Sequence, residues 1–426
     1  MAALTARRRR SRKQALSGSS QRIMGVDLAR GAALLAMIST HLLPTFAAEP
    51  SLGGQIVPTF VGLVFSGRSA ALFAVLAGVS LSLGRVPAAA NRPGLGLRAG
   101  VIAVVGLSLG ALSVNIAVIL VQYAVLFWCV IPVLRLQTKA LGLLAGAWIL
   151  LVPLVAFGLR PWLVDAPEPL RLGHNPTWVD LLEPPKLLAD VFVTGTYPVV
   201  EWFGYVLVGL WIGRLPLRRA GTQVGLLIGG AVAAVLAKGA EWALMVPLGG
   251  RAALLATPQA KQWPLEAMLR ANLTGVDQTG SVWWLATAAP HSGTTLDLLH
   301  TSGTSAAVLG AFLLVARVRP LERTRILAPL AGAGAMTLTL YTAHVCAVAW
   351  SEAGNPPQIS REGLLAVHIV AALAIGLLFR ANDWRGPLEW AAHGVYRLGL
   401  AGRTGRQRSG GGRLRTAEAR PPKPNR

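Results

Sequence analysis

Hydrophobic residues in this chain occur in long, uninterrupted blocks rather than at the alternating or three-to-four-residue spacing of soluble elements. Residues 99–134 carry no charged side chain, and 140–159 and 326–350 are equally free of Lys, Arg, Asp and Glu. A helix that crosses the hydrocarbon core of a membrane needs about 20 mostly apolar residues. The pattern therefore predicts an all-α, polytopic helical bundle embedded in a membrane.

Ten segments have the length and polarity of transmembrane helices. The block 99–134 is too long for one helix, so we expect it to break near Ser113-Val114-Asn115. The second segment has Arg68 near its middle, which leaves either a full span or a re-entrant segment followed by a short helix. The predicted spans are 24–46, 57–83, 98–115, 117–134, 140–159, 197–213, 222–248, 298–316, 327–350 and 363–379.

Composition agrees with a membrane protein, since 53% of the residues are hydrophobic and only 14% are charged. The net charge of +22 could indicate a nucleic-acid partner. On an alternating path, however, 30 of the 40 Lys and Arg residues fall on the side of the two termini and 7 on the other side. Short cytoplasmic loops carry such an excess of basic residues. We therefore expect cytoplasmic termini, outer loops at 160–196 and 249–297, a cell-membrane location and no nucleic-acid partner.

The chain divides into a basic tail (1–21), a membrane domain (22–397) and a second basic tail (398–426). Both tails have compositions that cannot build a core, and they are expected to be disordered and to contact anionic lipid headgroups. Because Cys129 and Cys346 lie inside apolar blocks, no disulfide framework or thiolate metal site is expected. No metal and no permanently bound cofactor are predicted.

The first span carries three ionisable residues, and such residues inside a membrane need a partner or a function. Arg30 and His41 are separated by eleven residues, so they share one helix face about 16 Å apart. Asp27 lies at the spacing that lets it pair with Arg30. The alternative is an interfacial ion pair with His41 merely in the outer headgroup region.

Other polar residues are candidates for binding roles. Arg68 could bind a phosphate or carboxylate, or form a structural salt bridge to Glu201 or Glu241. Lys238 and Glu241 are spaced to neutralise each other. Four further residues are candidate substrate ligands, although a solvated loop or simple helix-to-helix hydrogen bonds would explain them too: His291, Ser292, Tyr341 and His344.

Several of these motifs together resemble a known family. The sequence RIMGVDLARG from Arg22 to Gly31, the ten residues between Arg30 and His41, and FSGR ending at Arg68 resemble the transmembrane acyltransferase superfamily. Within it, the chain looks most like bacterial relatives of heparan-alpha-glucosaminide N-acetyltransferase. Thr194 to Pro198, Pro290 to Gly293 and Gly386 to Trp390 add to the resemblance.

The resemblance implies transfer of an acyl group, expected to be acetyl, from cytoplasmic acyl-CoA to a sugar or envelope glycan at the outer face. It implies that His41 is the catalytic base or acyl carrier and that Arg30 and Arg68 bind the donor. N- and O-acylation both remain open, and a homodimer is compatible with the sequence. Expected partners are membrane lipids, acyl-CoA, and a glycan or glycolipid acceptor.

Two other functions remain open. A transporter or flippase for an envelope precursor would also have buried charges, although we find no pair of Gly/Pro-broken helices in two halves, which inverted-repeat transporters tend to contain. A non-catalytic membrane partner of envelope enzymes would not bind acyl-CoA.

Overall fold

The computed structural model describes residues 23–83, 91–164, 174–318, 325–354 and 359–411. Helices dominate these residues, as the hydrophobic blocks predict. The longer ones and their direct neighbours are α2 (Met24–Leu42), α3 (Phe60–Val64), α4 (Arg68–Leu83), α5 (Arg92–Gly110), α6 (Leu120–Val133), α7 (Thr138–Val164), α9 (Val199–Ile212), α10 (Ala220–Met245), α14 (Thr295–Val315), α16 (Ala328–Ala335), α17 (Thr337–Glu352), α18 (Arg361–Ala381) and α19 (Pro387–Gly411).

Short elements connect these helices. They are the antiparallel strands β1 (Phe46–Glu49) and β2 (Gln55–Pro58), the helical turns η1 (Pro50–Leu52), η3 (Val179–Leu182), η4 (Asp190–Thr194, a π-helix) and η5 (Val282–Ala286), and the short helices α8 (Pro184–Ala189), α11 (Gly250–Leu255), α12 (Gln259–Gln262) and α13 (Leu265–Ala271).

Each predicted span contains a helix, but the predicted number of ten spans is not confirmed. Within the described part of the chain, six helices are long and apolar enough to cross a membrane, with Phe60–Leu83 counted as one. The number rises to eight if two bent pairs each form one span: Pro184–Thr194 with Val199–Ile212, bent by 53°, and Ala328–Ala335 with Thr337–Glu352, bent by 84°. The protein is therefore a multi-pass, helical membrane protein.

Two local predictions from the sequence are confirmed by the structure. The break in the 99–134 block is confirmed, because α5 ends at Gly110 and α6 begins at Leu120. The predicted neutralisation of Lys238 by Glu241 is confirmed by an Nζ–Oε2 distance of 2.6 Å. The bent pairs were not predicted from the sequence, and their interruptions leave helix ends inside the bundle. Irregular backbone at membrane depth is tolerated where protein buries it or a polar cavity borders it.

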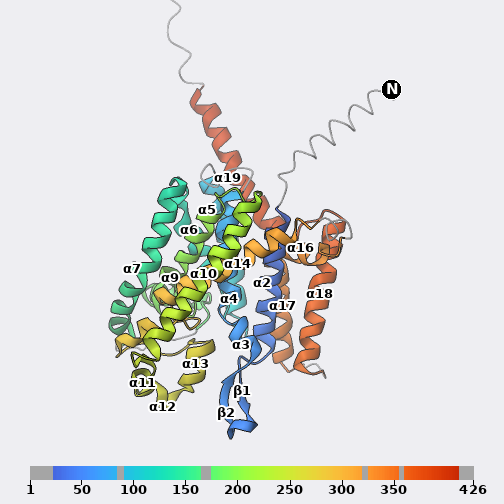
Figure 1. The fold of residues 1–426 in the computed structure, drawn as a ribbon. Helices are drawn as coiled ribbons and strands as arrows, with labels where there is room; N and C mark the ends of the chain where they lie inside the picture. The colour runs from blue at the N-terminus through green and yellow to red at the C-terminus, as the bar shows by residue number, and fades with distance from the viewer. Residues whose placement is uncertain (1–22, 84–90, 165–173, 319–324, 355–358, 412–426) are drawn as a thin grey trace, which may run out of the picture.

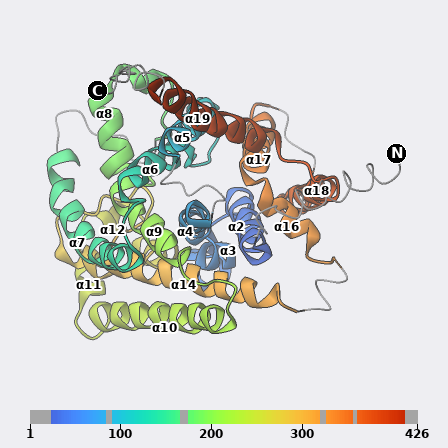
Figure 2. The same ribbon diagram turned by 90° about the horizontal axis from the view of Figure 1, so that it is seen from above.

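The bundle has two distinct ends (Figure 1). We call the end with β1–β2 and α11–α13 the hairpin end, and the end where α2 begins and α19 lies the tail end. Seen along the bundle, α2 and α4 are central, α10 and α14 lie side by side at one edge, and α16 to α18 form another side (Figure 2). The interior of the bundle is thus built around α2 and α4.

Glycines at helix crossings allow the central helices to approach closely. A Cβ on Gly209 of α9 would lie 2.0 Å from the carbonyl oxygen of Val75 in α4, and one on Gly78 would lie 2.3 Å from that of Val206. In α16, a Cβ on Gly334 would lie 1.8 Å from the carbonyl oxygen of Asp27. Small residues at such crossings are the usual way for membrane helices to associate.

The C-terminal helix extends farther than the sequence predicts. α19 continues to Gly411, past residue 398 where a structureless tail was expected. Part of the reason is packing against α5, since Gly399 lies directly on Gly94 and the Asn91 side chain donates to the Tyr396 carbonyl at 2.9 Å. The predicted N-terminal tail (1–21) and residues 412–426 lie outside the described residues.

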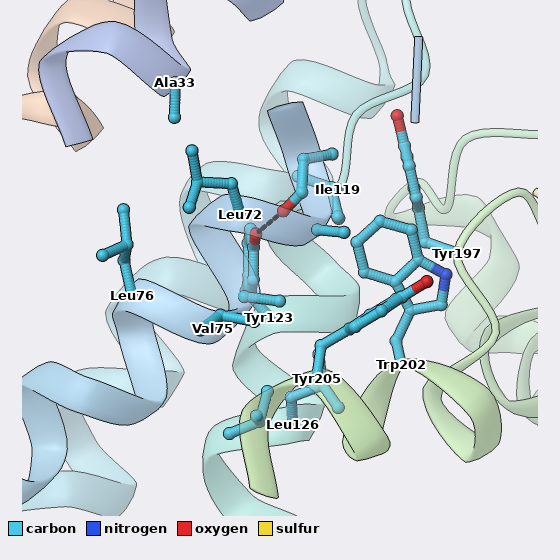
Figure 3. Close-up of a cluster of buried hydrophobic side chains, with 14 of the residues drawn as sticks. Ala33, Leu72, Val75, Leu76, Ile119, Tyr123, Leu126, Tyr197, Trp202 and Tyr205 are labelled. Carbon is cyan, nitrogen blue, oxygen red and sulfur yellow. Dashed lines mark hydrogen bonds between the residues drawn. The ribbon is translucent and has the colours of Figure 1, made fainter. Parts of the chain in front are cut away.

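A hydrophobic core joins α4, α6 and α9 (Figure 3). Leu72, Val75 and Leu126 are buried there, and the Tyr123 hydroxyl donates to the Ala70 carbonyl at 2.8 Å. Figure 3 also shows Tyr197, Trp202 and Tyr205 next to this core. These aromatic side chains lie between the apolar core and a polar site.

Candidate active site

Histidines from three helices meet near the end of α2. His41 Nδ1 lies 3.1 Å from His344 Nε2, and the two rings stack with 5.3 Å between centroids. His368 of α18 meets His344 edge-on at 4.9 Å, and Tyr341 meets His41 edge-on at 6.2 Å. We call these four residues the histidine cluster. It brings together three predicted site residues, His41, Tyr341 and His344, and adds His368.

The hydrogen bond between His41 and His344 constrains how each ring can act. A neutral imidazole has one donor and one acceptor nitrogen. If His41 Nδ1 donates to His344, then His41 Nε2 carries the lone pair and can accept a proton. His344 Nδ1 is buried and has no hydrogen-bond partner among the described residues. The pair therefore supplies a positioned base and one unsatisfied buried nitrogen.

Arg30 lies toward the tail end of α2, in a polar environment. Its guanidinium bonds Ser80 Oγ of α4 and lies 3.7 Å from an Asp27 carboxylate oxygen. Arg98 of α5 is near enough for its charge to repel that of Arg30, and its guanidinium also lies 5.7 Å from the centre of the Phe127 ring. Two arginines whose positive charges repel each other favour a bound anion. The sequence pattern did not single out Arg98.

The contacts of α2 with α4 show where the predicted site residues lie relative to one another along the bundle axis. The helices run antiparallel, because Arg30 meets Ser80 while Thr45 meets Gly62. His41 is eleven residues beyond Arg30, about 16 Å along α2, and Arg68 is twelve residues before Ser80, about 18 Å along α4. His41 and Arg68 therefore lie at nearly the same level, toward the hairpin end, and Arg30 lies well away from both.

A small cavity lies at that level, beside the break between α3 and α4. It is lined by Gly67, which precedes Arg68, and by the loop before α14 that carries His291. A Cβ on Gly67 would lie 3.1 Å from His291 Nε2, and Gly67 has a positive φ of 66°. The complete lining is Gly67, Thr196, Pro198, Glu201, Trp202, Tyr205, Pro290, His291, Gly293, Asp297, Leu298 and Thr301.

His291 is fixed in one protonation state and one tautomer. Burial lowers the pKa of His291 to about 4, although a hydrogen bond to the Thr196 backbone acts in the opposite direction. The ring is therefore neutral near pH 7. Its Nδ1 lies 3.2 Å from the Thr196 carbonyl oxygen, which can only accept, so Nδ1 carries the proton and Nε2 the lone pair. His291 also has φ 64°, a backbone conformation that is rare for a histidine and common at functional sites.

Charged groups around this cavity are paired in ways that the sequence left open. Glu201 binds Arg160 at 2.7 Å, so Glu201 is not the salt-bridge partner of Arg68. The Arg68 side chain donates to the Leu63 carbonyl. The negative charge of the Asp297 carboxylate is near enough to attract the Arg68 guanidinium. Asp297 Oδ2 accepts from the Gly293 amide at 3.2 Å and Oδ1 from the Thr301 hydroxyl at 3.0 Å.

A second cavity, about 50 Å³, adjoins the first and shares Thr196, Pro198 and His291 with it. It extends toward Arg160 and the loop from Leu273 to Gln278. Ser292, a predicted substrate ligand, is buried at 1% exposure and lines neither cavity. Its carbonyl oxygen lies 3.5 Å from Arg160 instead.

Several residues of this region were not predicted from the sequence as site residues. Arg160 ends an apolar block and Glu201 lies inside a span, and charges in such places were the available signal. Asp277 and Gln278 lie in a connection, where nothing in the pattern marks them. Thr196 lies in the stretch from Thr194 to Pro198, which was noted only for its resemblance to the family. Within the described residues, no group of three or more His, Cys, Asp or Glu side chains could hold a metal ion.

Comparison with known proteins identifies the family of this fold and site. Residues 22–247, more than half of the chain, match the family described as heparan-alpha-glucosaminide N-acetyltransferase, catalytic. A search of curated proteins finds no match. The matched region includes Arg30, His41, Arg68 and Glu201, whereas His291 and His344 come after it. The chain therefore belongs to the heparan-alpha-glucosaminide N-acetyltransferase catalytic family, which is a family of membrane acetyltransferases.

Proposed function

We propose that this protein transfers an acetyl group from acetyl-CoA to an amine or hydroxyl group of a sugar or envelope glycan at the outer face of the cell membrane. Family membership supports acetyl transfer. The observation that carries the assignment of the reacting site is the 3.1 Å contact between His41 and His344. It holds a neutral imidazole at the level of Arg68 and the cavity.

His41 is the general base in this proposal. Its Nε2 takes a proton from the acceptor amine or hydroxyl as the acceptor atom attacks the thioester carbonyl carbon. The carbon–sulfur bond then breaks, the acetyl group stays on the acceptor, and the CoA thiolate leaves and is protonated. Histidine suits this role near neutral pH. His344 is a positioning residue that orients the His41 ring, and Tyr341 limits the space beside it.

The donor is proposed to enter from the tail end, which the charge distribution predicts to be cytoplasmic. Arg30 and Arg98 would bind the phosphates of acetyl-CoA, and Arg68 would lie beside the acyl end. The separation of about 16 Å between Arg30 and the level of His41 is similar to the length of an extended pantetheine arm. The acceptor would bind at the hairpin end, where His291 contacts it and Ser292 supports the His291 loop from behind.

A purified preparation tests this proposal directly. Wild-type protein in detergent, given acetyl-CoA and D-glucosamine, should release CoA and form an acetylated product detectable by mass spectrometry. His41→Ala should lower the rate by about two to four orders of magnitude. His174→Gln is a matched control, because among the described residues His174 bonds only Asp180, at 3.0 Å, in a separate loop.

Near-full activity in a folded His41→Ala variant would remove His41 as the base. Product formation in detergent also separates an enzyme from a transporter or flippase, because no second compartment exists in that assay. If no product forms and acetyl-CoA does not bind, the enzymatic proposal is wrong.

A further inference from the structure

The second cavity contains polar atoms that the protein itself leaves unsatisfied. Thr196 Oγ1, Asp277 Oδ1 and Gln278 Oε1 are all buried without a hydrogen-bond partner among the described residues, and their residues line this cavity. Gln278 is only 5% exposed. Buried polar groups are nearly always hydrogen-bonded, and leaving one unpaired costs about 1–3 kcal/mol. Three such atoms around one cavity suit a ligand that offers hydrogen-bond donors.

The remaining bonds of these residues fix them in place. Gln278 Nε2 donates to the His291 carbonyl at 3.3 Å, which leaves its Oε1 for another partner. Asp277 Oδ2 accepts from the Thr279 hydroxyl at 2.8 Å, which leaves Oδ1. The Thr196 carbonyl accepts from His291, which leaves its hydroxyl. The Asp277 and Gln278 side chains are therefore each held by one bond, and Thr196 is held through its backbone, while one side-chain oxygen of each residue remains unused.

The charges around the cavity disfavour an anionic ligand. Arg160 is the one Lys or Arg among the lining residues, and it is paired with Glu201 at 2.7 Å. Asp277 adds a carboxylate that is not part of an ion pair among the described residues. A phosphate or sulfate would therefore meet acceptor oxygens and a carboxylate, which repel it. Neutral hydroxyl groups, or an ammonium group, would find acceptors.

We infer that this cavity is the subsite for the hydroxyl-bearing edge of the sugar acceptor, with Thr196, Asp277 and Gln278 as its specificity-determining ligands. The inference rests on the proposed function, since the same His291 that borders the reacting level also borders this cavity. A volume of about 50 Å³ accommodates one edge of a sugar and not a whole glycan. Thr196 lies within the region that matches the family, whereas Asp277 and Gln278 come after it.

Thr196→Val gives the sharpest test, because it removes an unpaired hydroxyl and keeps both the shape and the backbone carbonyl that binds His291. We expect the acceptor KM for D-glucosamine to rise about three- to tenfold, as for loss of one hydrogen bond. The acetyl-CoA KM and the melting temperature should stay unchanged. Asp277→Asn should behave similarly. Thr304→Val is the matched control, because its hydroxyl bonds the Thr301 carbonyl of the same helix at 3.0 Å and lines neither cavity.

Direct binding separates this inference from the proposed function. Saturation-transfer NMR with D-glucosamine should show binding to wild-type protein and weaker binding to Thr196→Val and Asp277→Asn, with or without acetyl-CoA. D-glucosamine 6-phosphate should bind less tightly than D-glucosamine. Acetyl transfer with unchanged acceptor KM in both variants would overturn the subsite and leave the function standing, as expected if only ordered water fills the cavity. Absence of any sugar binding to wild-type protein also overturns it.

Discussion

Two histidines at one level of the bundle are held by different partners. His41 is bound through Nδ1 to another imidazole, and His291 through Nδ1 to a backbone carbonyl. Each arrangement leaves Nε2 able to accept a proton when Nδ1 donates. The fixed carbonyl partner makes the tautomer of His291 permanent, whereas that of His41 depends on the proton position in His344.

Burial of His291 predicts a specific loss of stability in acid. Its pKa is lowered to about 4 in the folded protein, against about 6.5 when unfolded. The unfolded state therefore binds more protons between these values, so stability is fully present above pH 6.5 and decreases as pH falls toward 4. The slope from this one group is at most about 1.4 kcal/mol per pH unit.

His291→Asn should flatten that decrease. Asparagine tolerates the positive φ of this position and does not titrate. Melting temperatures of wild type and variant, measured from pH 7.5 to 4.5 in one detergent, give the comparison. Parallel pH profiles for the two proteins would show that His291 does not titrate in this way.

Changes at His344 should affect catalysis without affecting acceptor binding. His344→Gln keeps an amide near the Nε2 position and should lower kcat by less than tenfold, because it can still orient His41. His344→Phe keeps the stacking but not the hydrogen bond, and should lower kcat by about ten- to a hundredfold. Equal effects of the two variants, or a change in acceptor KM alone, would contradict a positioning role.

The sequence could predict contacts within one helix but not between helices. The stripe of Asp27, Arg30 and His41 follows from helix periodicity. The partners of His41 and Glu201 do not, because they depend on how helices pack: His344 is 303 residues from His41. For Arg68 the sequence left open a phosphate or carboxylate ligand or a salt bridge to Glu201 or Glu241, and these two carboxylates bind Arg160 and Lys238. The unpaired oxygens of Thr196, Asp277 and Gln278 appear only once the loop is folded.

At the scale of elements, glycine-to-backbone contacts and helix breaks determine where polar residues lie. The break at Gly67 places Arg68 at the start of α4, and the break from Gly195 to Pro198 brings Thr196 to both cavities. Composition predicts the apolar helices well, but the bend angles result from packing. The hairpin of β1 and β2 was likewise absent from the sequence prediction, because each strand has only four residues.

Adjacent glycines in α10 provide an internal test of this packing. A Cβ on Gly230 would lie 2.5 Å from the Gly303 carbonyl oxygen of α14, whereas one on Gly229 would contact nothing within 4 Å. Gly230→Ala should destabilise the protein by about 1–3 kcal/mol through overpacking. Gly229→Ala should be neutral or stabilising by up to about 1 kcal/mol, because alanine favours helix. Thermal melting of both variants tests this expectation. Equal melting temperatures would argue against a close contact between α10 and α14 at Gly230.

At the scale of the whole molecule, the distribution of basic residues predicts the orientation. Reporter fusions after residue 175 and at the C-terminus should show an outer position for the first and a cytoplasmic position for the second, because 30 of 40 Lys and Arg residues lie on the side of the termini. An active cytoplasmic reporter at residue 175 would reverse the orientation. The donor would then enter from the hairpin end.

The same polarity predicts that donor and acceptor affinities respond to mutations at opposite ends. Arg30→Gln and Arg98→Gln should each raise the Kd of acetyl-CoA by about tenfold and leave D-glucosamine binding unchanged, because the phosphates would lose a charged partner at the tail end. Lysine at either position should restore affinity poorly if the contact is bidentate. The effect should shrink at high salt, since added ions screen the attraction between these arginines and the phosphates of acetyl-CoA. Arg135→Gln is the control, because Arg135 is exposed and follows α6 toward the same end.

If Arg30 acts only as the partner of Asp27, the double variant Asp27→Asn/Arg30→Gln should recover the stability lost in Arg30→Gln, and acetyl-CoA affinity should match wild type throughout. Calorimetric titration of acetyl-CoA against these variants distinguishes the two roles, and unchanged affinity in both single variants would rule out a donor site at Arg30 and Arg98.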